Sequence, residues 1–233
     1  DEFEGPAGQL PDPAKWGFDI GTDWGNGQLE YDTDRAENAS LDGNGNLAIT
    51  ARQESYQGRN YTSARMTTEN KFEPTYGRFE ARIKLPVGKG IWPAFWLLGA
   101  DFDQVGWPQT GEIDVMEYLG QKPQEVHGTI HGPGYSASNG ITRMYTLEGD
   151  RFDLDFHRFA VEWDQSQIRW FVDDSLYHAV DRTDVPGEWV FDHPFYLILN
   201  VAVGGAWPGP PDATTRFPQT MLVDWVRVYR AAQ

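Results

Sequence analysis

Three carboxylates lie close together in the stretch GEIDVMEYLG. Glu112 and Asp114 are two residues apart, so a β-strand places both on one face, whereas a helix separates them by about 200°. Glu117 follows five residues after Glu112 and faces the other side of a regular strand. A β-bulge that absorbs one residue returns Glu117 to the face of the other two acids. We expect the bulge around Val115 and Met116, with Met116 as the extra residue.

Converging carboxylates on one strand face suit acid–base and nucleophilic chemistry. Two Glu side chains that lean toward each other can approach to about 5–5.5 Å, the carboxyl separation of a retaining glycosidase. Charge repulsion at that distance raises one pKa, so Glu117 is expected to stay protonated as an acid while Glu112 is ionised, with Asp114 between them. Two other interpretations remain open: a solvated strand face that carries ordinary acids, and a Ca²⁺ or Mg²⁺ site held by the carboxylates.

The elements that must position these acids read as short strands. Segments rich in β-branched and aromatic residues alternate with Gly- and Pro-rich turns such as DGNGN, PVGKG and GGAWPGPPD. No segment holds a 3.6-residue apolar period over a dozen residues, which argues against long helices. This pattern favours an all-β fold, an antiparallel β-sandwich of the jelly-roll kind. The expected strands span residues 45–53, 76–85, 112–118, 125–131, 157–164, 167–174, 194–203 and 220–230.

Composition narrows the class of protein. The 233 residues can bury a full core, and no linker or repeat appears, so we expect a single domain over residues 1–233. A net charge of −16 with scattered Lys and Arg argues against nucleic acid and anionic membrane surfaces as partners. The absence of Cys excludes a thiol nucleophile. The apolar run at 91–100 is too short to span a bilayer. Numerous Trp, Tyr and Phe rings offer platforms for the apolar faces of sugars.

The stretch GEIDVMEYLG resembles the active-site strand of glycoside hydrolase family 16, in the E-[IL]-D-x-x-E form of bacterial laminarinases. Lichenases and xyloglucan-active members lack the extra residue. The resemblance implies a curved jelly roll with an open cleft, and retaining endo-hydrolysis of β-1,3-glucan and possibly β-1,3-1,4-glucan. Glu112 would be the nucleophile, Glu117 the acid/base and Asp114 the assisting carboxylate, without a catalytic cofactor.

The resemblance covers nearly the whole chain. Further blocks follow in family order: SARMTTENKF, YGRFEARIKLP, WPAFWLLG, HGTIHGPGY, ILNVAVGGAWPG and MLVDWVRVY.

Three tryptophans in matching blocks are candidates for binding the polysaccharide. Trp92 and Trp96 share a face on a regular strand, although Pro93 disturbs it, and Trp96 can instead belong to the core. Trp207 lies in the turn-rich loop GGAWPGPP, where it can act as a sugar platform or pack beneath its own loop.

Polar candidates follow from the same resemblance. Arg65 resembles a cleft arginine that donates hydrogen bonds to sugar hydroxyls, with a structural arginine as the alternative. Asn26 matches a block that contacts sugars on the non-reducing side. His131 resembles a cleft histidine and is expected to hydrogen-bond near Glu117. For His127, which shares its strand face, a functional and a structural role both stay open.

Many family members carry a structural Ca²⁺ on the convex side, far from the catalytic residues. The matching positions are Glu4, the backbone carbonyl of Gly45 and Asp224. Oxygen ligands suit a hard cation, and the expected role is stability.

The acidic start DEFEG resembles a mature end, so we expect a secreted protein whose leader has been removed, and a monomer. Two alternatives to the β-1,3-glucan hydrolase remain. One is a hydrolase of agarose or carrageenan from the same family, although scattered Arg argues against a sulfated substrate. The other is a non-catalytic jelly-roll lectin, which leaves the three carboxylates unexplained.

Overall fold

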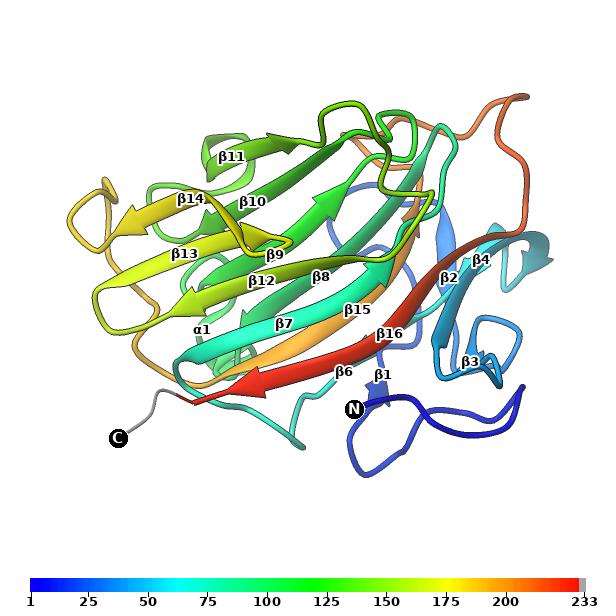
Figure 1. Ribbon diagram of the computed structural model, residues 1–233, viewed down its shortest axis with the longest axis horizontal. Helices are drawn as coiled ribbons and strands as arrows, with labels where there is room; N and C mark the ends of the chain where they lie inside the picture. Colours follow the sequence, from blue (N-terminus) through cyan, green and yellow to red (C-terminus); the bar gives the residue numbers. More distant parts are fainter. Residues whose placement is uncertain (231–233) are drawn as a thin grey trace.

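Alternating apolar residues produce strands along most of the chain, and these strands stack as two sheets (Figure 1). The computed structural model describes residues 1–230. Within this range, helix is limited to the short α1 (Phe102–Val105) and one 3₁₀ turn at Ala137–Asn139. The predicted all-β jelly-roll sandwich is confirmed.

The larger sheet covers the convex side of the sandwich and has the order β14-β13-β12-β7-β16-β4-β5-β2, with β3 paired to β4. Its pairs are antiparallel apart from β2 with β5, which run parallel and depart from the predicted antiparallel arrangement. Its strands are β2 (Glu30–Asp32), β3 (Ala39–Leu41), β4 (Leu47–Tyr56), β5 (Arg59–Ser63), β7 (Gly77–Lys84), β12 (His157–Trp163), β13 (Gln167–Val172), β14 (Ser175–Asp181) and β16 (Gln219–Tyr229).

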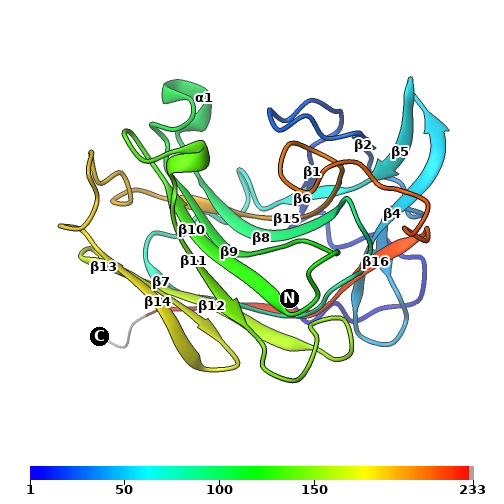
Figure 2. The same cartoon turned by 90° about the horizontal axis from the view of Figure 1, so that it is seen from above.

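The smaller sheet is antiparallel throughout, in the order β1-β6-β15-β8-β9-β10-β11. It bends, and the α1 loop and the segments around β1 and β2 stand on its concave side (Figure 2). This bend leaves a concave face whose floor is β15, β8, β9 and β10. Its strands are β1 (Gly17–Phe18), β6 (Arg65–Thr67), β8 (Ile91–Gly99), β9 (Glu112–Tyr118), β10 (Glu125–His131), β11 (Ile141–Thr146) and β15 (Phe195–Val203).

The core lies between the two sheets and unites side chains from Phe3 to Val226 in one main cluster. Trp163 and Trp170 from the larger sheet are fully buried in it, together with Phe95 of β8. Burial of rings this large supplies much of the stabilisation of a sandwich. Many of the aromatic residues are therefore core residues, and only some remain for a binding surface.

Pro93 lies within β8, a central strand, where a proline normally removes a ladder hydrogen bond. The last residue of β8 that is paired with β9 is Ala94, which lies opposite Glu117. Pro93 lies one residue beyond this pair and has no partner on β9. On the other side Pro93 is paired with Val201 of β15. The strand stays regular, and the predicted disturbance does not occur.

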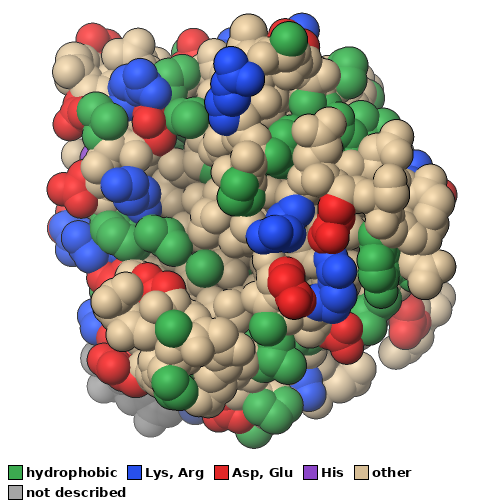
Figure 3. All heavy atoms as spheres, turned by 90° about the vertical axis from the view of Figure 1, so that its right-hand side faces the viewer, with side chains coloured by type: hydrophobic (Ala, Val, Ile, Leu, Met, Phe, Trp, Pro, Cys, Tyr) green, Lys and Arg blue, Asp and Glu red, His purple; other side chains and the backbone are tan. Residues whose placement is uncertain are grey.

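Charges on the outer surface are mixed. On the face that Figure 3 shows, Lys and Arg side chains lie among Asp and Glu side chains, without a separate basic patch. Ion pairs join opposite charges at the protein surface, such as Arg59 with Asp23 at 2.6 Å and Arg227 with Glu2 at 2.8 Å. Such a surface does not attract a polyanion. Among residues 1–230, no helix has the length and apolarity needed to cross a membrane.

Candidate active site

A β-bulge in β9 brings the three carboxylates onto one face. Against β8, Asp114 is paired with Trp96 and Met116 with Phe95, so Val115 has no partner. The register against β10 slips at the same place. The predicted position of the bulge is confirmed, but Val115 and not Met116 is the extra residue. Val115 and Met116 are both buried, so two successive apolar side chains point to the core and the alternation of faces resumes one residue later.

Cross-strand partners show that this shared face is the concave one. Glu117 is paired with Ala94 of β8, while Asp114 is paired with Trp96 and Glu112 with Leu98. Paired residues project to the same side of a sheet. The carboxylates therefore project from the floor of the concave face. Of the three, Glu112 keeps 19% of its side chain exposed and Asp114 is almost fully buried.

Each carboxylate has a specific polar neighbour. The indole nitrogen of Trp107 donates to Oε2 of Glu112 over 2.8 Å, and that of Trp92 donates to Oε1 of Glu117 over 3.2 Å. Nε2 of His131 lies 3.4 Å from Oδ2 of Asp114 and 3.9 Å from Oε1 of Glu112. Indole groups donate hydrogen bonds and cannot accept them. The two indoles hold one oxygen of each Glu carboxyl, and the other oxygen of Glu112 faces His131.

Burial and mutual repulsion raise the pKa values of all three acids. Burial, followed by the charge of Asp114, raises the pKa of Glu112 to about 8, while His131 and the Trp107 N–H favour its ionised form. Burial raises the pKa of Asp114 to about 7. For Glu117, burial and then the charges of Asp114 and Glu112 raise the pKa well above its ordinary value. The raised pKa of Glu117 favours its protonated form, which a general acid needs.

The histidines lie on the same face, but not in the predicted positions. β10 runs antiparallel to β9, so His131, at the end of β10, is paired with Glu112, at the start of β9. His127 is the residue opposite Glu117. The prediction that His131 hydrogen-bonds near Glu117 is wrong, because antiparallel pairing places the end of β10 next to the start of β9, where His131 meets Asp114 and Glu112. His131 instead lies at the end of the site that holds Glu112 and Asp114.

Aromatic rings form a cluster at the Glu117 end. The Trp207 ring packs edge-on against Trp92 at 5.6 Å and against His127 at 5.0 Å, measured between ring centroids. Trp207 keeps 43% of its surface exposed, so it does not pack beneath its loop. Burial lowers the pKa of His127, which favours the neutral imidazole next to the Trp207 indole. Such a surface can stack on the apolar face of a sugar ring.

A second cluster surrounds Arg65. Its guanidinium lies over the rings of Trp24 and Trp96, 4.9 and 4.8 Å from their centroids, and its Nε donates to Asp19 over 2.8 Å. Trp96 is half-buried and donates its indole N–H to Asn200 over 2.8 Å, so it belongs to the concave face and not to the core between the sheets. Stacking and the ion pair fix the direction of the guanidinium.

Asn26 is exposed on the loop before β2. Its backbone carbonyl accepts a hydrogen bond from Ala206 over 2.8 Å, which ties this loop to the one that carries Trp207. A side chain at Gly205 would meet the Asn26 carbonyl and the Trp92 ring at 3.2 and 3.3 Å, so the two loops approach closely over Trp92. The structure thus places Asn26 at the border of the concave face.

Comparison with known proteins gives the family. A sequence model of the glycosyl hydrolases family 16 matches residues 23–227. The chain belongs to glycosyl hydrolase family 16. A curated relative, a beta-glucanase of Rhodothermus marinus, is 48% identical over 99% of this chain and 83% of its own length.

Solved structures of the family resemble this family 16 chain along its whole length. The laminarinase catalytic domain of Thermotoga maritima superposes with a TM-score of 0.94 at 52% identity, covering 100% of this chain and 97% of its own. The endo-beta-1,3-glucanase of Pyrococcus furiosus superposes with a TM-score of 0.93 at 51% identity, covering 98% and 92%. The resemblance seen in the sequence blocks is therefore confirmed at the level of the family and its fold.

Several residues of the site escaped the sequence reasoning. Trp107 contacts Glu112 from the loop after α1, and a Trp-Pro pair in a turn just before the acidic strand was the available signal. Trp24 and Asp19 brace Arg65 from the segment between β1 and β2, where nothing in the local pattern marks them. Asn200 lies within the apolar run of β15, and a single amide in such a run was a usable signal.

Two groups of residues bear on metal binding. Among the described residues, Glu112, Asp114 and His131 offer ligand atoms that all lie within 4.8 Å of one another. Glu112 and Asp114 are candidate catalytic acids, so an acid–base site explains this proximity without a metal.

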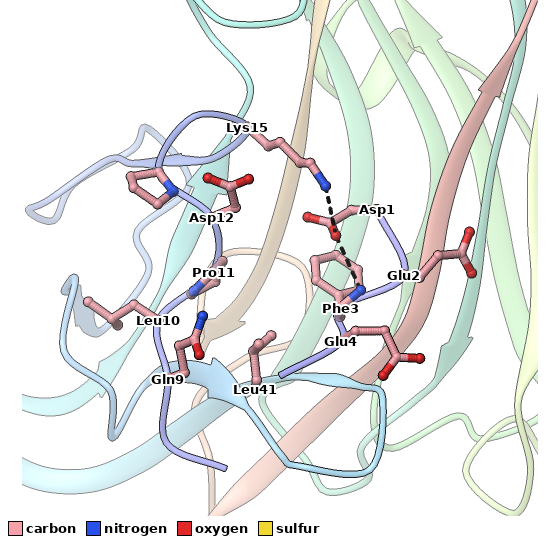
Figure 4. Close-up of a pocket in the computed structure, with 11 residues that line it drawn as sticks. Asp1, Glu2, Phe3, Glu4, Gln9, Leu10, Pro11, Asp12, Lys15 and Leu41 are labelled. Carbon is pink, nitrogen blue, oxygen red and sulfur yellow. Dashed lines mark hydrogen bonds and ion pairs between the residues drawn. The ribbon is translucent and has the colours of Figure 1, made fainter. Parts of the chain in front are cut away.

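The predicted Ca²⁺ ligands lie on the convex side. Glu4 lines a surface hollow formed by the N-terminal segment and Leu41 (Figure 4). Its Oε1 lies 3.9 Å from the position of a side chain at Gly45, which adopts a φ of +83° in a tight turn. Asp224 occupies the register shift of β16 and forms an ion pair with Arg82 at 2.5 Å. Glu4 and Gly45 thus meet at one place and offer oxygen donors of the kind that a hard cation prefers.

Proposed function

We propose that this family 16 protein is an endo-β-1,3-glucanase of the laminarinase type, which acts by retention of configuration. The observation that carries the proposal is the bulged strand β9, which presents Glu112, Asp114 and Glu117 on one concave face. The names of the relatives agree with this substrate class. The family 16 chain would bind a β-glucan along the concave face, with the aromatic cluster of Trp92, Trp207 and the braced Arg65 as contacts.

The reaction would take two steps. An oxygen of Glu112 attacks the anomeric carbon while Glu117 gives its proton to the glycosidic oxygen, so the bond to the leaving sugar breaks and a glycosyl ester forms. Glu117, now a carboxylate, then accepts a proton from a water molecule whose oxygen attacks the same carbon and releases Glu112. Two inversions at one carbon return the β configuration.

The surroundings of the two Glu residues support these roles. Burial and the neighbouring charges raise the pKa of Glu117, which suits the residue that must carry a proton. Glu112 receives a hydrogen bond from Trp107 and faces His131, and both favour the negative charge that a nucleophile needs. Asp114 lies between Glu112 and Glu117 on β9, and its charge raises the pKa of both. The three acids titrate as one coupled group and do not all ionise together.

The experiment is product release from a linear β-1,3-glucan and from a mixed-linkage β-1,3-1,4-glucan, by the wild type and by Glu112→Gln. We expect internal cleavage of the linear glucan, lost in Glu112→Gln, and a product whose anomeric proton signal is initially β. An initial α signal would overturn retention. Cleavage of agarose or carrageenan alone would move the enzyme to another substrate of the family. Binding without release of reducing ends would indicate a lectin.

The remaining proposals concern state and stability. We propose a secreted, monomeric, single-domain catalytic unit that needs no catalytic cofactor; size-exclusion chromatography with light scattering tests the monomer. Cell fractionation of the native source tests the localisation.

We also propose that Glu4, the Gly45 carbonyl and Asp224 hold a Ca²⁺ that ties the N-terminal segment to β16. Ca²⁺ should raise the melting temperature and EDTA should lower it, without immediate loss of activity at 25 °C. An immediate loss would contradict a purely structural role.

A further inference from the structure

Trp170 reaches the catalytic strand from the opposite sheet. It lies in β13 of the larger sheet, is fully buried, and donates its indole N–H to the backbone carbonyl of Asp114 over 2.8 Å. The ring is held on its other side by His178 of β14, stacked at 4.6 Å between centroids with an interplanar angle of 24°. The indole is therefore fixed in direction before it contacts β9.

The carbonyl that Trp170 contacts lies at the start of the bulge. Asp114 is the last residue of β9 in regular register before Val115, which has no partner on β8. A bulge disturbs the ladder locally, so backbone groups near it need other partners when buried. The Trp170 N–H supplies such a partner from outside the sheet, and Asp114 in turn satisfies the buried indole.

The Trp170 ring also packs closely against β10, at Gly128. Gly128 of β10 lies opposite the bulge, between His127 and Thr129, where the register slips. A side chain on Gly128 would come within 2.5 Å of Cδ1 of Trp170 and within 2.5 Å of the Tyr177 hydroxyl. Only glycine leaves room for the indole edge against the sheet, so the ring, the glycine and the bulge fit one another.

From these contacts we propose that Trp170 is a positioning residue that holds the Val115 bulge through the Asp114 carbonyl. This role rests on the proposed function, because the bulge is what turns Glu117 to the face of Glu112. Without the hydrogen bond, β9 can slip toward regular alternation, which would turn Glu117 away from the concave face. Trp170 touches no substrate; it acts through the backbone of the catalytic strand.

The test compares Trp170→Phe with Trp163→Phe. Trp163 is also buried in the core, and its indole N–H also donates to a backbone carbonyl, that of Phe191, at 3.0 Å. Both variants remove one indole and one hydrogen bond, so we expect similar losses of melting temperature. A misplacement of about 1 Å can cost roughly 100-fold in rate. We expect kcat on linear β-1,3-glucan to fall about 10- to 100-fold in Trp170→Phe, with KM within about threefold, and to stay within about twofold in Trp163→Phe.

Hydrogen–deuterium exchange of the segment Glu112–Tyr118 provides a readout that needs no substrate. We expect faster exchange there in Trp170→Phe and not in Trp163→Phe. Equal kcat and equal exchange in the two variants would overturn the proposal. If Trp170→Phe does not fold, 3-benzothienylalanine at position 170 keeps the ring shape and lacks the N–H, and the same two outcomes apply.

The two proposals fail in different ways. If the wild type cuts no β-1,3-glucan, the proposed function fails, while the exchange measurement still reports on the bulge. If the wild type cuts the glucan and the Trp170 variants match Trp163→Phe in rate and exchange, the function stands and the positioning role falls.

Discussion

Trp107 donates its indole N–H to a carboxylate oxygen of Glu112 over 2.8 Å, although the two residues belong to a surface loop and a central strand. The Trp107 ring keeps 41% of its surface exposed and lies 5.9 Å from the ring of His131, measured between centroids. The loop after α1 thus closes one end of the concave face. It places a hydrogen-bond donor on the proposed nucleophile where solvent still has access.

Replacing Trp107 with Phe should shift the acidic limb of the pH–rate profile to higher pH. The indole N–H favours the ionised form of Glu112, so its loss raises the pKa of a carboxyl that must be ionised to attack. We expect kcat to fall about tenfold, which corresponds to one hydrogen bond to a charged group. The measurement is kcat/KM between pH 4 and 9, with Trp225→Phe on the convex sheet as the control. An unshifted acidic limb would remove Trp107 from this role.

Replacing Asp114 with Asn should move both limbs of the profile to lower pH. The charge of Asp114 is the second cause, after burial, of the raised pKa values of Glu112 and Glu117. Without that charge, Glu112 ionises at lower pH, and Glu117 also loses its proton at lower pH. The same profile, recorded with a soluble β-1,3-glucan, checks this. A profile that falls in height without moving would mean that Asp114 acts through geometry alone.

The buried carboxyl of Asp32 should make the protein less stable as the pH rises. Burial raises the pKa of Asp32 to about 7, against partial compensation by a hydrogen bond from Trp24 and by the charge of Arg65. The folded state therefore binds a proton that the unfolded state loses above about pH 4. This contribution to stability is complete below about pH 4 and is lost progressively as the pH rises to about 7.

Urea denaturation at pH 5 and pH 8 tests this account of Asp32. We expect Asp32→Asn to reduce the difference in unfolding free energy between the two pH values by on the order of 2–4 kcal/mol. Part of the pH dependence should remain, because burial also raises the pKa of Glu30. Asp103→Asn, at an exposed position of α1, is the control. An equal pH dependence in wild type and Asp32→Asn would show that Asp32 stays ionised in the folded protein.

Removing the Trp207 ring should weaken substrate binding with little effect on stability. The ring is exposed and touches Trp92 and His127 only edge-on. A stacked ring contributes about 1 kcal/mol, so Trp207→Ala should raise KM roughly fivefold. Leu176→Ala on β14, which removes another exposed apolar side chain away from the concave face, should leave KM unchanged. A lower melting temperature with an unchanged KM would instead indicate that Trp207 supports its loop.

Much of the site could be predicted because it depends on local pattern. Strand periodicity placed Glu112 and Asp114 on one face and required a bulge to add Glu117, and the structure contains that bulge. The same periodicity put Trp92 and Trp96 on one face of β8, as its regular pairing with β15 confirms. The choice between Val115 and Met116 as the extra residue depended on the partner strand, and here the prediction failed.

The sequence by itself determined the strand pattern, the acidic strand and the family, because each of these is written in residues close together along the chain. The tertiary structure decided which side chains meet the acids. Antiparallel pairing of β9 with β10 set His131 beside Glu112 and His127 beside Glu117. The stacking of the two sheets brought Trp170 to the Asp114 carbonyl. Contacts between residues 56 positions apart depend on register and sheet packing, and neither can be read from local periodicity.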